Sequence, residues 1–190
     1  MTSIARHVFL LLMLLGPSMA ISAEPARDLS PQGLAPYWFK AVRAGDMDLV
    51  ETLLQRGIDI EVTNERGFSA LILAAYNGQP ALVSDLLKRG ADPNRGDRTG
   101  NTALMGALFR GDEASARLLL ADPRIDIDRK NNAGQTAAMF AALFGRTELL
   151  LELADHGADL DAVDAAGASV RSLAARQGHD TLLAELDKRH

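Results

Sequence analysis

Nine glycines divide most of this chain into segments of nearly equal length, and this spacing limits the folds available to it. One series has intervals of 33, 33, 34 and 33 residues and consists of Gly45, Gly78, Gly111, Gly145 and Gly178. A second series has intervals of 33, 34 and 33 residues and consists of Gly67, Gly100, Gly134 and Gly167. Because the two series keep the same phase, one supersecondary unit is repeated along the chain. Stacked repeats form a long contact surface, so the spacing favours a binding protein over an enzyme.

The segment 65–94 shows the content of one repeat. Ser69 is placed to cap a short helix that runs to Tyr76 and ends at Gly78, where a C-terminal glycine is favourable. Pro80 suits the first position of a second helix, since its missing N–H has no intrahelical partner there. The apolar stripe of this second helix consists of Leu82, Val83, Leu86 and Leu87. One repeat is therefore predicted to be a helix–turn–helix unit.

The same pattern recurs before and after this segment. A single helix pair of this size cannot bury its apolar face. Stacking removes each leucine from water and contributes roughly 1.5–3 kcal/mol per side chain. We therefore predict an all-α solenoid of about five stacked helix–turn–helix repeats. The expected repeats span about 37–64, 65–97, 98–131, 132–164 and 165–190.

Short motifs are shared between the copies. They are Gly67-Phe68-Ser69-Ala70-Leu71, Ala74-Ala75 followed by Gly78, Leu86-Leu87 followed by Gly90-Ala91-Asp92-Pro93-Asn94, and Gly157-Ala158-Asp159. On these motifs, residues 37–190 resemble an ankyrin-repeat array. The resemblance implies the solenoid fold and a protein partner.

Three segments depart from a regular array. The loop 121–126 contains a one-residue insertion and lacks the usual glycine, which predicts a bend or an altered turn. The last copy begins with the degenerate, polar segment 169–172, as expected of a capping repeat. Near the other end, Tyr37, Trp38 and Phe39 are predicted to cover the exposed face of the first repeat.

The resemblance places the partner along the turn tips and the inner, concave face of the first helices. The residues at these positions that we expect to contact the partner are Arg66, Phe68, Tyr76, Asn77, Asn101, Phe109, Arg110, Gln135, Leu143, Phe144 and Arg176. Tyr76, Phe109, Leu143 and Phe144 are the expected anchors, because apolar side chains that lose water inside a polar margin dominate protein binding. The alternative is that these side chains pack between adjacent first helices.

The N-terminus has the pattern of an export signal. Arg6 precedes an apolar run that Gly16 and Pro17 break, and small residues permit cleavage after Ala23 or Ala20. We expect a signal peptide at 1–23, a linker at 24–36, a repeat domain at 37–190 and a periplasmic location. A permanent membrane anchor is the alternative, but the apolar run is far shorter than the roughly 20 residues that span a bilayer.

Composition argues against several other classes of function. The chain has no cysteine, which excludes disulfides and thiolate metal sites. Its net charge of −5, without a basic tract, argues against a nucleic-acid partner. Neither a phosphate-binding glycine loop nor a serine-nucleophile motif is present. We interpret His156, His179 and His190 as structural, so we expect no metal, no cofactor and no enzymatic activity.

These patterns predict a non-enzymatic protein-interaction module that is monomeric when free. The chain is similar to small exported bacterial ankyrin-repeat proteins, and this resemblance implies an accessory factor for a periplasmic catalase or related haem enzyme in peroxide defence. An inhibitor or immunity protein for a toxin or enzyme is an alternative. A haem or metal carrier that uses the surface histidines is another.

Overall fold

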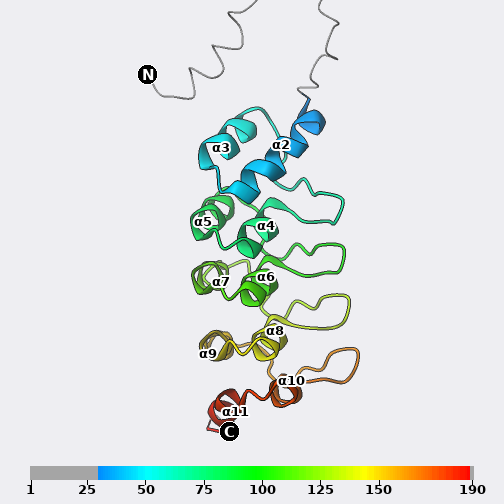
Figure 1. Cartoon of the computed structure of the whole chain (residues 1–190), viewed down its shortest axis with the longest axis vertical. Helices are drawn as coiled ribbons and strands as arrows, with labels where there is room; N and C mark the ends of the chain where they lie inside the picture. Colours follow the sequence, from blue (N-terminus) through cyan, green and yellow to red (C-terminus); the bar gives the residue numbers. More distant parts are fainter. Residues whose placement is uncertain (1–29, 189–190) are drawn as a thin grey trace, which may run out of the picture.

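The structure is a computed structural model that describes residues 30–188. Ten helices within these residues form two parallel columns (Figure 1). The first helix of each pair lies in one column: α2 (Pro31–Ala44), α4 (Ala70–Tyr76), α6 (Ala103–Arg110), α8 (Ala137–Leu143) and α10 (Val170–Gln177). The second helices form the other: α3 (Met47–Gln55), α5 (Pro80–Lys88), α7 (Glu113–Leu120), α9 (Thr147–Asp155) and α11 (Asp180–Asp187). The prediction of an all-α solenoid with five helix pairs is confirmed.

Helical structure begins earlier than residue 37, where we expected the repeat domain to start. Helix α2 starts at Pro31, after Ser30, whose hydroxyl accepts a hydrogen bond from the Gly33 N–H at 3.2 Å. The proline that we assigned to a linker therefore occupies the first turn of a helix, where its missing N–H is tolerated. The expected signal peptide and residues 24–29 of the expected linker lie outside the described residues.

The first helices begin at side-chain caps, as predicted for Ser69. The hydroxyls of Ser69, Thr102, Thr136 and Ser169 each accept from the N–H three residues later, at 3.3–3.4 Å. These bonds satisfy donors that a helix N-terminus otherwise leaves unpaired. Each first helix therefore starts at a fixed position in its repeat, which keeps the stacked helices in register.

The core is continuous along both columns. Ala74 and Ala75 are fully buried, and their small side chains allow α4 to pack closely against its neighbour α6. Leu86 of α5 and Leu119 of α7 are also fully buried between successive second helices. Since each repeat contacts only its neighbours, the fold is stabilised by a chain of local interfaces.

The first repeat is closed by aromatic side chains, as expected for part of the 37–39 segment. Trp38 is fully buried and Phe39 is 7% exposed, so both belong to the core. Tyr37 is 50% exposed and points away from it. The expected cover therefore consists of Trp38 and Phe39.

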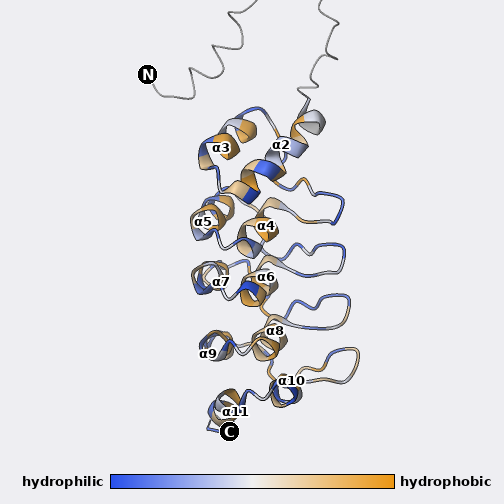
Figure 2. Ribbon diagram, in the orientation of Figure 1, coloured by the Kyte–Doolittle hydropathy of each residue, from blue (hydrophilic) through white to orange (hydrophobic). Residues whose placement is uncertain are grey.

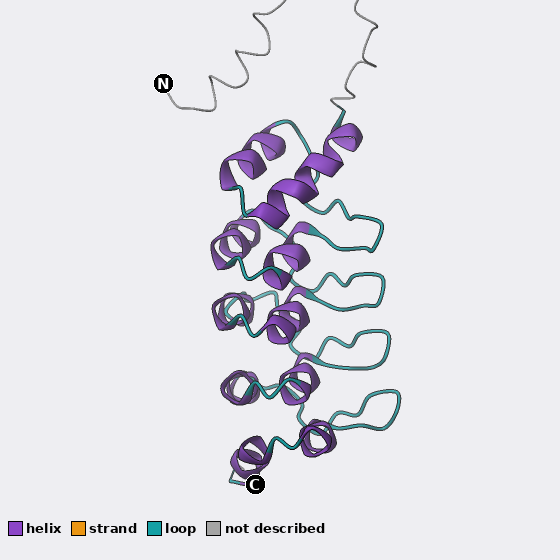
Figure 3. Cartoon of the chain, viewed as in Figure 1, coloured by secondary structure: helices purple, strands orange, loops and turns teal. Residues whose placement is uncertain are grey.

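Long hairpin loops join one repeat to the next and project from the column of first helices (Figure 3). We call residues 61–68, 94–101, 128–135 and 161–168 the hairpin loops. In each loop one side-chain oxygen accepts from backbone N–H groups two and four residues later; the acceptors are Asn64, Asp97, Asn131 and Asp164. Neighbouring loops are also joined directly, for example from the Asn132 N–H to the Thr99 carbonyl at 2.9 Å. These bonds hold the loops as a ladder.

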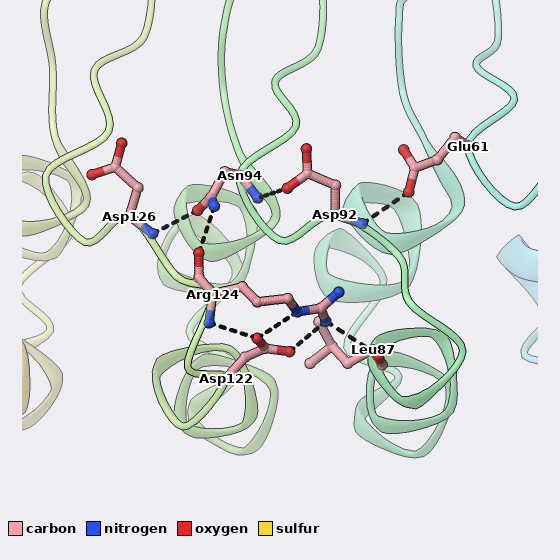
Figure 4. A network of polar contacts seen from close by, with 7 residues as sticks. All are labelled: Glu61, Leu87, Asp92, Asn94, Asp122, Arg124 and Asp126. Carbon is pink, nitrogen blue, oxygen red and sulfur yellow. Dashed lines mark hydrogen bonds and ion pairs between the residues drawn. The ribbon is translucent and has the colours of Figure 1, made fainter.

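The altered turn predicted at 121–126 is confirmed, and an arginine stabilises it (Figure 4). Ala121 ends α7 in a right-handed conformation, without the glycine found after α3, α5 and α9. The Arg124 guanidinium donates to both carboxylate oxygens of Asp122, at 2.9 and 2.6 Å, and to the Leu87 carbonyl at 3.2 Å. The hydrogen bond from the Arg124 side chain is the main reason that the pKa of Asp122 is lowered.

Two further bonds connect this turn to the preceding repeat. The Asn94 side chain donates to the Arg124 carbonyl and accepts from the Asp126 N–H, both at 2.7 Å (Figure 4). One repeat earlier, the Asp92 N–H donates to the Glu61 carboxylate at 2.9 Å. The inserted residue is thus accommodated without a break between repeats. Within residues 30–188, no helix has both the length and the apolar composition needed to cross a membrane.

Candidate partner-binding surface

Four aromatic side chains form a continuous cluster on the surface of the first helices. The Tyr76 and Phe109 rings stack with centroids 5.4 Å apart and planes at 8°. Phe109 meets Phe144 edge-on at 5.0 Å, and Phe144 lies 6.1 Å from Phe140. Tyr76 is 45% exposed and Phe109 is 43% exposed. We call these four residues the aromatic ladder, and we call the surface of the first helices and hairpin loops the inner surface.

A groove of about 440 Å³ opens beside the ladder. Gly106 lines this groove. The equivalent positions in the neighbouring repeats are Leu73 and Phe140, which have larger side chains. The missing side chain leaves Ile72 and Met105 in the lining of this groove. We call this cavity the Gly106 groove.

The hairpin loops provide the opposite wall of the Gly106 groove. Phe68 contributes an apolar side chain, and the Arg66 guanidinium lies 4.7 Å from the centre of the Phe68 ring. Arg98 and Asn101 come from the next loop. The groove therefore has an apolar floor and a polar rim, which is the arrangement typical of a site for an anchoring side chain.

The structure gathers five of the eleven predicted site residues around one cavity. Arg66, Phe68, Tyr76, Asn101 and Phe109 all line the Gly106 groove. The Asn101 amide also accepts from the Asn131 side chain at 2.8 Å, so part of its hydrogen-bonding capacity supports the loop ladder.

Other predicted residues lie around this centre. Gln135 and Asn101 line an adjoining shallow groove that also reaches Phe140. Phe144 joins the aromatic ladder. Arg110 and Arg176 are exposed near the C-terminal ends of α6 and α10 and do not line the Gly106 groove.

Two further predicted residues, Leu143 and Asn77, make contacts within the repeat array. Leu143 is only partly exposed and packs against the core, as in our alternative interpretation, because its side chain is shorter than those of Tyr76 and Phe109 at equivalent positions. The Asn77 side chain donates to the Leu73 carbonyl at 2.7 Å and so stabilises the end of its own helix.

Sequence reasoning missed Gly106, Phe140 and Arg98. A glycine inside a helix is unfavourable by about 1 kcal/mol relative to alanine, so Gly106 carried a signal of a special position. Phe140 gave no such signal, because its contribution depends on the empty space above Gly106 in the preceding repeat. Arg98 sits at the tip of a loop, where charged residues are ordinary.

Charge is divided between the two helix columns. The five first helices contain five basic residues and no acidic residue: Lys40, Arg43, Arg110, Arg171 and Arg176. The five second helices contain ten acidic residues and two basic ones. Figure 2 shows hydrophilic residues along the hairpin loops that precede α4, α6 and α8, while the helices carry both hydrophobic and hydrophilic residues. The hairpin loops add five basic and six acidic residues, so the inner surface has a net positive charge although the whole chain carries a net charge of −5.

The described histidines make backbone contacts. His156 Nδ1 lies 2.8 Å from the Glu152 carbonyl oxygen, and His179 Nε2 lies 3.4 Å from that of Leu143. His190 is outside the described residues. Across residues 30–188, His, Asp and Glu side chains do not form a group of three or more that could hold a metal ion.

A two-column helical solenoid with an exposed groove along one layer is a repeat protein of the kind that binds other macromolecules. Comparison with family models identifies the type of repeat. Residues 38–131 match the model for ankyrin repeats in three copies, and residues 133–162 match the model for a single ankyrin repeat. The chain belongs to the ankyrin-repeat family, whose members are typically non-enzymatic modules for protein–protein interaction. Among curated proteins, none gives a significant match to this chain.

Proposed function

We propose that this protein is an exported, non-enzymatic module that binds a protein partner through the aromatic ladder and the Gly106 groove. The observation that supports it best is the exposure of Tyr76 and Phe109 beside a groove with an apolar floor. Large aromatic side chains that are buried on binding are the commonest anchors of protein interfaces. The ladder also spans three successive repeats, so one partner can contact several of them at once.

The test replaces two ladder residues and measures partner affinity. The double variant Tyr76→Ser/Phe144→Ser removes both ends of the stacked and edge-on contacts around Phe109. We expect partner affinity to fall at least tenfold, since losing true anchors costs about 2 kcal/mol or more. Tyr37→Ser is the matched control, because Tyr37 is similarly exposed but lies outside the ladder. Affinity within twofold of the wild type for the double variant would contradict the proposal.

Export is the second part of the proposal, and the pattern of residues 1–23 supports it. Fractionation of the producing cells is expected to recover the chain from the periplasm. N-terminal sequencing is expected to begin at Glu24 or at Ile21, according to the cleavage point. A cytoplasmic chain that retains Met1 would contradict this part alone.

The resemblance to small exported ankyrin-repeat proteins makes a periplasmic catalase or related haem enzyme the first partner to examine. Titration of the purified chain with that enzyme gives the affinity directly. Binding that the ladder variant weakens and the Tyr37→Ser control preserves would support this partner. Equal binding by both variants would assign the contact to another surface.

A further inference from the structure

We propose that the Gly106 groove takes an acidic segment of the partner, with one large apolar side chain inserted above Gly106. The inference rests on the proposed function and specifies the chemistry of the partner. It follows from the distribution of charge and from the shape of the groove.

Most arginines of the inner surface lack carboxylate partners; the exceptions are Arg95, which pairs with Glu61, and Arg171, which pairs with Asp187. In the described part of the chain, no ion pair is formed by Arg43, Arg66, Arg98, Arg110 or Arg176. We call the second helices and the turns that follow them the outer layer; among its described arginines, Arg89, Arg117 and Arg124 form ion pairs and Arg56 does not. Arg89 pairs with Glu51 and Asp85, and Arg117 pairs with Glu113 and Glu152. Unpaired guanidinium groups around an exposed groove attract carboxylates, both in approach and in the bound state.

Two acidic residues, Glu65 and Asp97, line the groove, but neither forms an ion pair with Arg66 or Arg98. Asp97 lines the groove, but its carboxylate accepts from the Thr99 N–H, the Thr99 hydroxyl and the Asn101 N–H at 2.6–3.0 Å. Glu65 is exposed beside Arg66 and forms no ion pair among residues 30–188. Arg66 and Arg98 therefore remain available at the rim.

The floor of the groove suits an apolar side chain. Ile72 and Met105 line it, Phe68 and Phe109 stand at its sides, and no side chain rises from Gly106. A cavity of about 440 Å³ falls within the roughly 300–1,000 Å³ typical of ligand sites. If an aromatic or leucine side chain of the partner segment occupied the floor, acidic residues next to it in that segment could contact Arg66 and Arg98 at the rim.

A single-stranded nucleic acid is the other ligand that combines negative charge with flat apolar groups. Such ligands need open aromatic faces on which bases stack. In this groove Tyr76 and Phe109 each use one face on the other, at a centroid distance of 5.4 Å. The ten acidic residues of the second helices also repel a long polyanion. The structure therefore favours a protein segment.

Fluorescence anisotropy with three labelled peptides tests the inference on the whole purified chain. The first peptide has a central phenylalanine flanked by glutamates and aspartates. In the second, alanine replaces that phenylalanine, and in the third, lysines replace the acidic residues. We expect the first peptide to bind at least fivefold more tightly than the second and at least tenfold more tightly than the third.

Two pairs of protein variants locate the binding site. Gly106→Leu fills the groove, whereas Gly106→Ala adds only a Cβ, which would lie 3.8 Å from the Tyr76 Cβ in ordinary contact. We expect Gly106→Leu to lower affinity for the first peptide at least tenfold and Gly106→Ala to stay within twofold. Arg66→Glu/Arg98→Glu should lower affinity at least tenfold, whereas Arg56→Glu, on the outer layer, should stay within twofold.

Several results would overturn the inference. They are absence of binding by the first peptide, equal binding by the lysine peptide, an unaffected Gly106→Leu variant with native circular dichroism, or tighter binding of oligothymidylate. The proposed function fails separately. If Tyr76→Ser/Phe144→Ser weakens the protein partner but Gly106→Leu does not, the proposed function stands and the present inference falls. If neither change weakens the partner, both fall.

Discussion

Gly100 shows how closely successive hairpin loops approach one another. Its φ is +80°, and a Cβ added there would lie 2.8 Å from the Asn132 side-chain oxygen and 2.9 Å from the Asn132 backbone nitrogen. We expect Gly100→Ala to lower the free energy of unfolding by about 2–3 kcal/mol, because backbone strain and a clash with the next loop act together. Urea denaturation followed by circular dichroism measures this change.

Gly90 provides a control that separates strain from contact. Its φ is +94°, but an added Cβ would meet nothing within 4 Å. We expect Gly90→Ala to cost about 1 kcal/mol from strain alone. A Gly100→Ala variant as stable as Gly90→Ala would show that the loops move apart at little cost.

Asp122 provides a test in acid. Because the Arg124 side chain stabilises its charged form, the pKa of Asp122 lies below the usual 3.8. A lowered pKa in the folded state stabilises the protein above the unfolded pKa, and this stabilisation is lost as pH falls through the folded pKa. At pH 7 we expect the free energy of unfolding of the wild type to exceed that of Asp122→Asn by about 0.5–1 kcal/mol. The difference is small because the Arg124 side chain is partly exposed to solvent.

The pH dependence of that difference is the decisive measurement. Urea midpoints of both proteins, measured from pH 7 down to pH 2, should converge as Asp122 becomes protonated. Asp161→Asn is the control, because the exposed Asp161 side chain forms no ion pair among the described residues. If the difference in urea midpoint between the wild type and Asp122→Asn stays constant over this pH range, the substitution acts through packing and not through the charge of Asp122.

Among the helices, α10 and α11 form the most loosely packed pair. A cavity of about 380 Å³ lies between them and α9, and it is lined by Ala154, Ala158, Val170, Arg171 and Leu186. By contrast, α7 packs against three helices, α5, α6 and α9. We expect amide hydrogens of α11 to exchange at least tenfold faster than those of α7, because local openings need less free energy where fewer apolar contacts are broken. Hydrogen exchange with mass spectrometry measures this ratio, and equal protection would contradict it.

The helix boundaries show what can be predicted from sequence. Ser69 was identified as a cap from its neighbours alone, because capping depends on residues within one turn. The start of α2 was missed, since burial of Leu34 and Trp38 against the array stabilises a helix that contains Pro36. Local patterns thus predicted the repeated units, while the end of the array depended on tertiary packing.

The candidate site was predicted less completely than the helices, for a related reason. Tyr76 and Phe109 were identified from their place in the repeat, and they are exposed as expected. Phe140 was missed, and Leu143 is less exposed than Tyr76 and Phe109, because the exposure of either side chain depends on the residues of the adjacent repeat. Gly106 defines the groove through an absent side chain, which periodicity alone does not reveal.

Across the whole molecule, the two helix columns differ in charge and in the contacts that their charged residues make. The second helices form ion pairs from one repeat to the next, such as Arg117 with Glu152, and so contribute to stacking. The first helices carry only basic charges on a surface without carboxylate partners in their own column. Stacking contacts and the proposed partner-binding surface therefore lie on different helix columns.

The linear arrangement of the repeats also predicts how the molecule unfolds. Trp38 is the only tryptophan and is fully buried in the first repeat, so its fluorescence reports that end, while circular dichroism reports all helices. In the wild type we expect the two signals to change together in urea. Leu119→Ala removes a fully buried side chain from central α7 and should cost about 2–5 kcal/mol.

This central loss should weaken coupling between the two ends, because no contact bypasses a repeat in a solenoid. We expect the circular dichroism midpoint of Leu119→Ala to fall further than the Trp38 midpoint, so that the two transitions separate. Leu186→Ala, a matched change in α11, should leave the Trp38 midpoint at its wild-type value. Coincident transitions in Leu119→Ala, both shifted to lower urea, would instead mean that the described repeats unfold as one cooperative unit even when their central interface is weakened.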